Sequence, residues 1–107
     1  MMKKLIYRLP RYHVDLPVVL HFTARTISGR CTDISSEGVG VRLLDEPLVG
    51  ESVILEFVLR GKSVRANARV EYRSDINFYG LRFQFSSESE RQSITQLIES
   101  QKGLPHG

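Results

Sequence analysis

The sequence has a single cysteine, no tryptophan and no apolar run close to the roughly 20 residues that a membrane-spanning helix needs. Its longest apolar stretch, residues 53–59, contains Glu56. The basic start of the chain is followed by a tyrosine, an arginine and a proline before any apolar segment long enough for a signal peptide. Cys31 has no partner for an internal disulfide, and we expect a half-buried thiol. These absences predict a cytoplasmic protein without membrane insertion.

Motifs for catalysis and metal binding are also absent from the sequence. Its histidines, His13, His21 and His106, have no metal-ligand spacing with Cys31 or with the acidic residues. There is no phosphate-binding glycine loop of the Walker type and no nucleophile elbow. We therefore expect structural roles for the histidines, no metal, no cofactor and no enzymatic activity.

The length of 107 residues, with 41% hydrophobic and 25% charged residues, is typical of one soluble domain. Positive charge gathers at its start, where residues 1–14 contain four lysines and arginines and no acid. This cluster indicates either an anionic partner or a solvated basic tail. We divide the chain into a flexible basic segment (1–13), a folded domain (14–100) and a frayed tail (101–107).

Alternation of apolar and polar residues predicts β-strands along most of the chain. The pattern is clearest in the fifth strand, where the even positions from Val64 to Tyr72 face the core and charged residues face water. In the sixth strand it directs the odd positions from Tyr79 to Phe85 inward. The predicted strands are residues 16–22, 30–35, 38–44, 53–60, 64–73 and 78–85.

A short helix is predicted after the last strand. Ser87 and Glu90 have the spacing of a capping box, and Ile94, Leu97 and Ile98 form a narrow apolar stripe. Short strands, tight turns and one amphipathic helix favour a small closed barrel, because closure removes exposed sheet edges. We expect an all-β fold whose helix plugs or flanks one opening of the barrel.

Residues 33–38 end one predicted strand, turn and begin the next. With a period of two, Asp33 and Ser35 project to the same side while Ile34 enters the core. A carboxylate at Asp33 is a suitable acceptor for the N1–H and N2 amino group of guanine, and Gly38 allows the backbone to turn close to a ligand. The alternative is a serine- or aspartate-type turn that satisfies only its own backbone.

Residues 33–38 (DISSEG) resemble the D/N-x-S-x-x-G motif of the PilZ family. Residues 7–11 (YRLPR) resemble the arginine motif that precedes the first strand of that family. Residues 16–18, residues 79–83 and the terminal helix extend the resemblance over nearly the whole chain. It implies a six-stranded antiparallel PilZ-type β-barrel with a C-terminal α-helix, which binds the bacterial second messenger cyclic di-GMP.

The chain departs from the family at the arginine motif, where the family has two arginines spaced R-x-x-x-R. Arg11 matches the second arginine, but Tyr7 stands at the position of the first, and Arg8 gives R-x-x-R. Lys4 with Arg8 restores the spacing but leaves Arg11 outside the pair, so we prefer Arg8 with Arg11. Arginine binds guanine through two donors, stacks on bases and neutralises phosphate, whereas tyrosine only stacks. The ligand site implied by the resemblance consists of Tyr7, Arg8, Arg11, Asp33, Ser35 and Gly38.

We expect a non-catalytic cyclic di-GMP receptor whose ligand orders the basic N-terminal segment and thereby creates a face for a downstream protein effector. A second hypothesis is a degenerate PilZ adaptor that has lost the nucleotide. Tyr7 supports it, whereas the two retained arginines and residues 33–38 oppose it. A third hypothesis, a barrel that binds single-stranded nucleic acid, is disfavoured because the aromatic residues of the last strand alternate inward and leave few for stacking.

Overall fold

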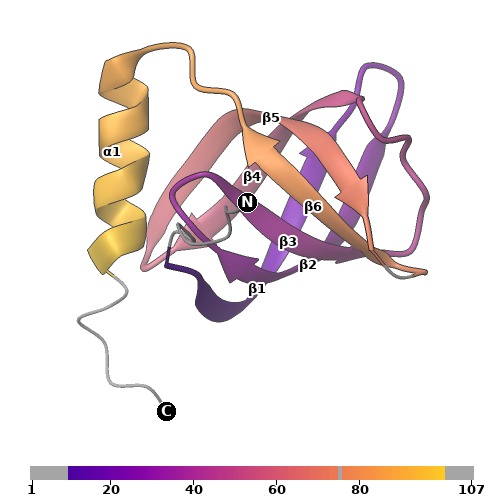
Figure 1. Ribbon diagram of the computed structural model, residues 1–107, viewed down its shortest axis with the longest axis horizontal. Coiled ribbons are helices and arrows are strands. Elements are labelled where there is room, and N and C mark those ends of the chain that lie inside the picture. Colours follow the sequence, from indigo (N-terminus) through magenta and orange to yellow (C-terminus); the bar gives the residue numbers. More distant parts are fainter. Residues whose placement is uncertain (1–9, 75, 101–107) are drawn as a thin grey trace, which may run out of the picture.

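The computed structural model describes residues 10–74 and 76–100, which form six antiparallel strands and one helix (Figure 1). The strand order β1-β2-β3-β6-β5-β4 closes into a barrel because β1 also pairs with β4. The predicted all-β barrel with a C-terminal helix is therefore confirmed. The elements are β1 (Tyr12–His21), β2 (Thr26–Ile34), β3 (Gly38–Leu43), β4 (Ser52–Leu59), β5 (Lys62–Arg73), β6 (Phe78–Phe83) and α1 (Glu88–Glu99).

The first two strands begin four residues earlier than the alternation indicates. β1 starts at Tyr12 instead of residue 16, and β2 starts at Thr26 instead of residue 30. In the early part of β1 the inward residues Tyr12 and Val14 are only partly buried against the core. In the early part of β2 only Ile27 is buried. The weak burial explains why the sequence pattern understates both strands.

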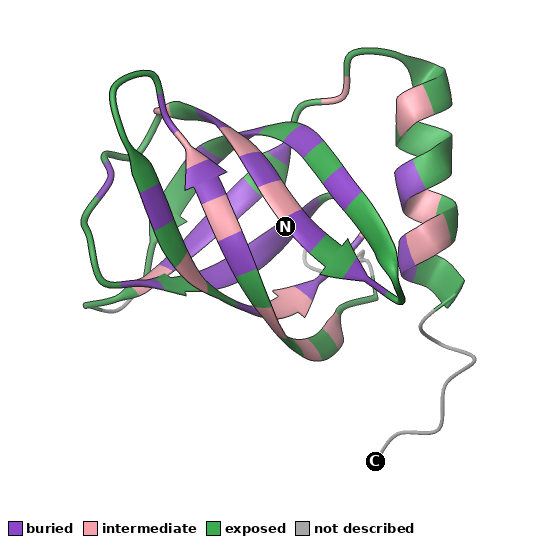
Figure 2. Ribbon diagram, turned by 180° about the vertical axis from the view of Figure 1, so that it is seen from behind, coloured by how far each residue is buried: buried purple, intermediate pink, exposed green. Residues whose placement is uncertain are grey.

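The core fills the interior of the barrel. Along most strands buried and exposed residues alternate, which appears as purple and green bands on the ribbon (Figure 2). In β5, for example, Val64, Ala66, Ala68 and Val70 are all buried as predicted. Phe85 lies beyond the end of β6 and is only partly buried, packed against the core.

Helix α1 stands at one end of the barrel (Figure 1). Ile94 and Ile98 are buried in the common core, as the apolar stripe predicts. Ser87 Oγ caps the helix by accepting from the Glu90 amide at 3.1 Å, while Glu90 Oε1 accepts from the amide of Ser86. No helix in the described part of the chain is long and apolar enough to span a membrane.

Two bulges decide which way the side chains at the middle of the sheet point. In β2, Thr32 is an extra residue between the pairs Cys31–Val41 and Asp33–Gly40. A bulge shifts the strand by one residue and re-aims the side chain that follows it. Cys31 is buried in the core, whereas Asp33 lies on the outward face.

The second bulge, in β5, overturns the predicted orientation of Tyr72. Glu71 is an extra residue between the pairs Val70–Leu81 and Tyr72–Gly80. The alternation places Tyr72 in the core, but its ring lies on the outward face over Gly80 and the residue is 46% exposed. The prediction is wrong because one inserted residue reverses the alternation at the end of the strand.

The Cys31 thiol is fully buried, not half-buried as the sequence suggests. Its Sγ lies 3.3 Å from the carbonyl oxygen of Asp33, to which it donates. Burial, together with the negative charge of Asp33, raises the pKa of the thiol to about 12. The folded protein therefore holds almost no thiolate at this position at neutral pH.

We predict that the thiol reagent DTNB does not label Cys31 in the folded protein at pH 8 but labels it fully in guanidinium chloride. The reason is that the thiolate is the attacking species and the core excludes the reagent. The absorbance of the released thionitrobenzoate measures the reaction. Fast labelling without denaturant would show that Cys31 is accessible and contradict this account.

Candidate functional site

The turn between β2 and β3 brings three of the predicted site residues together. Arg11 Nη2 lies 3.0 Å from Asp33 Oδ1 in an ion pair. Arg11 Nη1 donates to Ser35 Oγ at 3.3 Å. Tyr7 and Arg8 lie outside the described residues. The residues just before β1 and the turn thus meet at Arg11.

Ser35 builds the turn. Ser35 is 1% exposed, and its Oγ accepts hydrogen bonds from the amides of Glu37 and Gly38 at 3.2 and 3.3 Å. The Ser35 amide in turn donates to the carbonyl oxygen of Gly38 at 2.9 Å. Ser35 therefore satisfies the backbone of its own turn, but not only that, because its hydroxyl also accepts a hydrogen bond from Arg11.

Asp33 takes no part in this turn. Its Oδ2 accepts from the hydroxyl of Thr32 at 3.2 Å. Its Oδ1 is buried and accepts no hydrogen bond from the described residues, although the positive charge of Arg11 lies 3.0 Å away. A carboxylate has about four lone-pair sites. Asp33 therefore keeps unused capacity to accept hydrogen bonds.

Gly38 has a packing role that the sequence does not reveal. A Cβ on Gly38 would lie 2.0 Å from the carbonyl oxygen of Leu81 and 3.1 Å from Arg82 Cα. Both are backbone atoms of β6, which cannot move away without breaking the sheet. Gly38 is therefore required for the close approach of β3 to β6.

Two further glycines form a floor beside Asp33. Gly40 pairs with Gly80 across β3 and β6. A Cβ on Gly40 would lie 2.4 Å from Asp33 Oδ2 and 2.6 Å from Phe78 Cζ, and a Cβ on Gly80 would lie 2.3 Å from the Tyr72 ring. The carboxylate and two aromatic rings thus lie directly over these glycines. We call Gly40, Gly80, Phe78 and Tyr72 the glycine platform.

Sequence reasoning missed this platform. The unbroken alternation assigns Tyr72 to the core, which removes the aromatic ring that covers Gly80. The available signal was the presence of glycine at outward positions of two adjacent strands, because a glycine inside a strand often marks the close approach of another group.

Two arginines next to the glycine platform, Arg82 and Arg42, differ in whether they form an ion pair. Arg82 Nε donates to Glu71 Oε1 at 2.7 Å, and hydrogen bonding and charge from Glu71 raise the pKa of Arg82. The Arg42 guanidinium lies 5.8 Å from the centroid of the Phe78 ring. Within residues 10–74 and 76–100, Arg42 makes no ion pair. Its charge is available to an anion.

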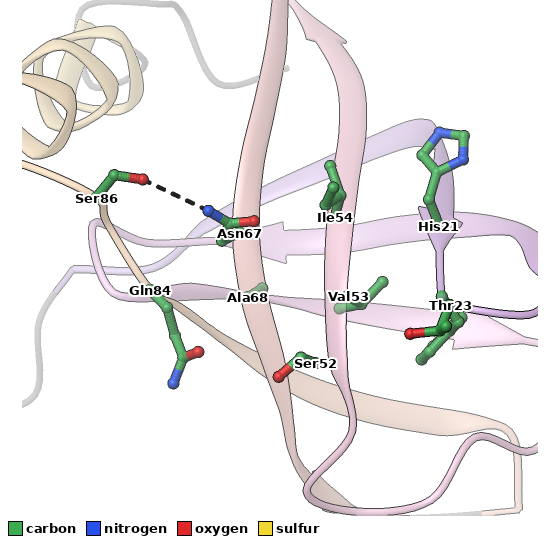
Figure 3. Close-up of a pocket in the computed structure, with 10 residues that line it drawn as sticks. His21, Thr23, Ser52, Val53, Ile54, Asn67, Ala68, Gln84 and Ser86 are labelled. Atoms are coloured by element: carbon green, nitrogen blue, oxygen red, sulfur yellow. Dashed lines mark hydrogen bonds between the residues drawn. The ribbon is translucent and has the colours of Figure 1, made fainter.

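A groove of about 510 Å³ lies away from this cluster, along β4, β5 and the segment after β6 (Figure 3). Its ten lining residues include Ile54, Asn67 and Ser86 but no arginine, lysine or acid, and none of the predicted site residues. Without positive charge it fits an anionic ligand poorly. We therefore place the candidate site at Arg11 and Asp33.

His21, which also lines the groove, has a structural partner. Its Nε2 lies 2.6 Å from Glu56 Oε1, and the hydrogen bonds of His21 and Arg65 lower the pKa of Glu56. Among the described residues no cluster of three histidine, cysteine or acidic side chains is arranged to hold a metal ion.

Comparison with known proteins matches residues 8–100 to the sequence model of the PilZ domain. No curated protein sequence matches the chain significantly. The fold is similar to the PilZ domain of CeSA from a cellulose-synthesizing bacterium, with a TM-score of 0.73 and 18% identity over 87% of this chain and 98% of that chain. It is also similar to the PilZ domain with c-di-GMP of YcgR from Escherichia coli, with a TM-score of 0.74 and 16% identity over 92% of both chains.

A third similar structure is the Bacillus subtilis inhibitor of motility MotI, with a TM-score of 0.71 and 19% identity over 92% of this chain and 52% of that chain. At these identities the three structures establish a common fold.

We predict that Ser35→Ala lowers the free energy of unfolding by about 1–3 kcal/mol, because it leaves the buried amide of Gly38 without its acceptor. Urea unfolding followed by circular dichroism measures the change. The matched control is Ser63→Ala, since Ser63 is exposed on β5. Equal unfolding midpoints for the two variants would show that Ser35 does not hold the turn.

Proposed function

Because the chain belongs to the PilZ domain family, we propose that it is a non-catalytic receptor for cyclic di-GMP. The observation that carries this proposal is the meeting of Arg11 with Asp33 and Ser35 on one surface. The similar YcgR domain was solved with c-di-GMP, which supports the same ligand class here.

The chemistry of these side chains fits the two parts of the ligand. Cyclic di-GMP carries two phosphate charges and two guanine bases. Arg11 supplies a permanent positive charge in a planar group that suits phosphate or the guanine O6 and N7 atoms. Asp33, whose side chain is 19% exposed, is the acceptor for the guanine N1–H and N2 amino group.

Arg11 is able to bind the ligand without leaving Asp33. A guanidinium has five N–H donors, and the contacts with Asp33 and Ser35 involve one donor atom each, Nη2 and Nη1. The Arg11 side chain is 44% exposed, so it is accessible to a ligand. We propose that Arg11 bridges the turn and the ligand, and that Arg8 and Tyr7 add charge and stacking from the preceding segment.

The ligand, in this proposal, signals by ordering the N-terminal segment. Tyr12 and His13 already pair with β2, so the ordering is confined to the residues before Tyr12. Those residues carry repelling positive charges, and an anion offsets both the repulsion and the entropy of fixing the segment. The fixed segment then presents a new face to a downstream protein effector.

The alternative is an adaptor that binds proteins without the nucleotide. Tyr7 in place of the first motif arginine favours it. The contact of Arg11 with Asp33 favours the receptor, because an adaptor has no need for an exposed arginine held beside a carboxylate.

Calorimetric titration tests this function. We predict that cyclic di-GMP binds, that GMP and a short oligonucleotide bind much more weakly, and that Arg11→Ala weakens binding about ten- to hundredfold, because a charged hydrogen bond contributes about 1.5–3 kcal/mol. Tyr7→Arg is expected to tighten binding by restoring the first arginine of the motif.

Arg91→Ala is the matched control, because Arg91 lies on α1 and pairs with Glu88 of the same helix. It should leave the affinity unchanged. Absence of heat with the wild-type chain at high micromolar ligand would favour the adaptor hypothesis. Equal affinities for wild type, Arg11→Ala and Tyr7→Arg would refute the placement of the arginines.

Hydrogen exchange tests the ordering of the segment. We predict that cyclic di-GMP protects the amides of residues 5–11 and those around Asp33, with little change in residues 64–70 of β5, which are paired in the free barrel. Mass spectrometry of peptic fragments measures the protection. Equal protection of residues 5–11 with and without ligand would disprove the switch while leaving the binding site intact.

A further inference from the structure

The glycine platform has a feature that the two sequence motifs do not require: an exposed aromatic ring next to the Asp33 carboxylate. The bulge at Glu71 turns Tyr72 outward, and Tyr72 is 46% exposed. The ring atoms Cε2, Cζ and Oη of Tyr72 are the atoms that a Cβ on Gly80 would meet. The far half of the ring therefore lies over Gly80 and leans toward β3.

The Asp33 carboxylate and the Tyr72 ring lie over neighbouring glycines of the glycine platform. Asp33 Oδ2 lies over Gly40, and the Tyr72 ring lies over Gly80. The two glycines are directly paired, and paired residues of antiparallel strands have Cα atoms about 5 Å apart. A hydrogen-bond acceptor and a flat aromatic surface thus lie over two neighbouring positions of the sheet.

We propose that Tyr72 is the stacking surface for one guanine of the ligand, whose N1–H and N2 edge is held by Asp33. This inference rests on the proposed function and assigns a residue outside both sequence motifs. A base stacked on the Tyr72 ring extends toward Gly40, where the Asp33 carboxylate and the edge of the Phe78 ring lie side by side, and its edge meets the carboxylate. Arg42, which makes no ion pair within the described residues, lies beside Phe78 on the same surface and would supply positive charge to the adjoining phosphate.

A structural role for Tyr72 makes a different prediction. An aromatic ring placed over a cross-strand glycine stabilises a sheet by covering its exposed backbone. If that is its whole role, replacing the ring changes stability and leaves ligand affinity unchanged. Stacking requires a flat ring, whereas covering Gly80 requires only bulk, so the leucine and phenylalanine variants separate the two roles.

The first experiment measures cyclic di-GMP affinity by calorimetry and thermal unfolding for Tyr72→Phe, Tyr72→Leu and Tyr72→Ala. The phenylalanine variant is expected to bind within about twofold of wild type. The leucine and alanine variants are expected to bind about five- to 150-fold more weakly, which is the range for loss of one base–aromatic stack. Wild-type affinity in Tyr72→Leu and Tyr72→Ala overturns the proposal.

The second experiment uses the absence of tryptophan from the chain. In Tyr72→Trp the new indole is the sole tryptophan, and a guanine stacked on it quenches its fluorescence. Val58→Trp is the control, because Val58 is 54% exposed on β4 and lies outside the platform. We expect quenching on saturation with cyclic di-GMP in Tyr72→Trp and none in Val58→Trp.

The outcomes distinguish this inference from the function on which it rests. Binding heat without a change in Tyr72→Trp fluorescence overturns the stacking role and leaves the receptor function standing. Absence of binding by the wild-type chain overturns both. Quenching of both indoles to the same extent indicates collision with free nucleotide and also overturns the stacking role.

Discussion

The outward face of this barrel depends on the close pairing of Gly40 with Gly80, because any side chain at either position would collide with what lies above it. Bulges on both sides of this pair aim groups over it. The extra residue in β2 directs Asp33 outward, and the extra residue in β5 does the same for Tyr72. Unbroken alternation from the buried Cys31 would place Asp33 in the core. Unbroken alternation from the buried Val70 would place Tyr72 there and leave Gly80 uncovered. The surface is therefore a product of irregular strand pairing.

Arg11 and the first residues of β1 lie against the same surface. His13 of β1 pairs directly with Asp33 of β2. Arg11 lies two residues before His13 and contacts the Asp33 carboxylate. Ser35 supports the contact from the turn, and its hydroxyl is itself fixed by backbone amides. The rigid half of the site is thus complete within the barrel. In the proposed function, ligand binding adds the residues before Arg11 to a surface that is already formed, so that a small anion controls the placement of a chain segment.

Much of this arrangement follows from sequence, and the remainder has identifiable physical reasons. The barrel, the helix cap at Ser87 and the convergence of Arg11 with Asp33 follow from hydrophobic period and motif, because burial and local hydrogen bonds decide them. Tyr72 does not, since a bulge reverses its face without altering the apolar pattern. The role of Gly38 is hidden for a similar reason, because the atoms that exclude a side chain belong to a strand more than 40 residues away.

If cyclic di-GMP binds the face between Arg11 and Tyr72, as we propose, the backbone amides of that face respond when NMR spectra are recorded during titration. We expect the largest chemical-shift changes at Asp33, Gly40 and Gly80, with the amides of Asn67 and Ser86 in the uncharged groove unchanged. The largest changes at the groove, with the glycine amides unmoved, would contradict it.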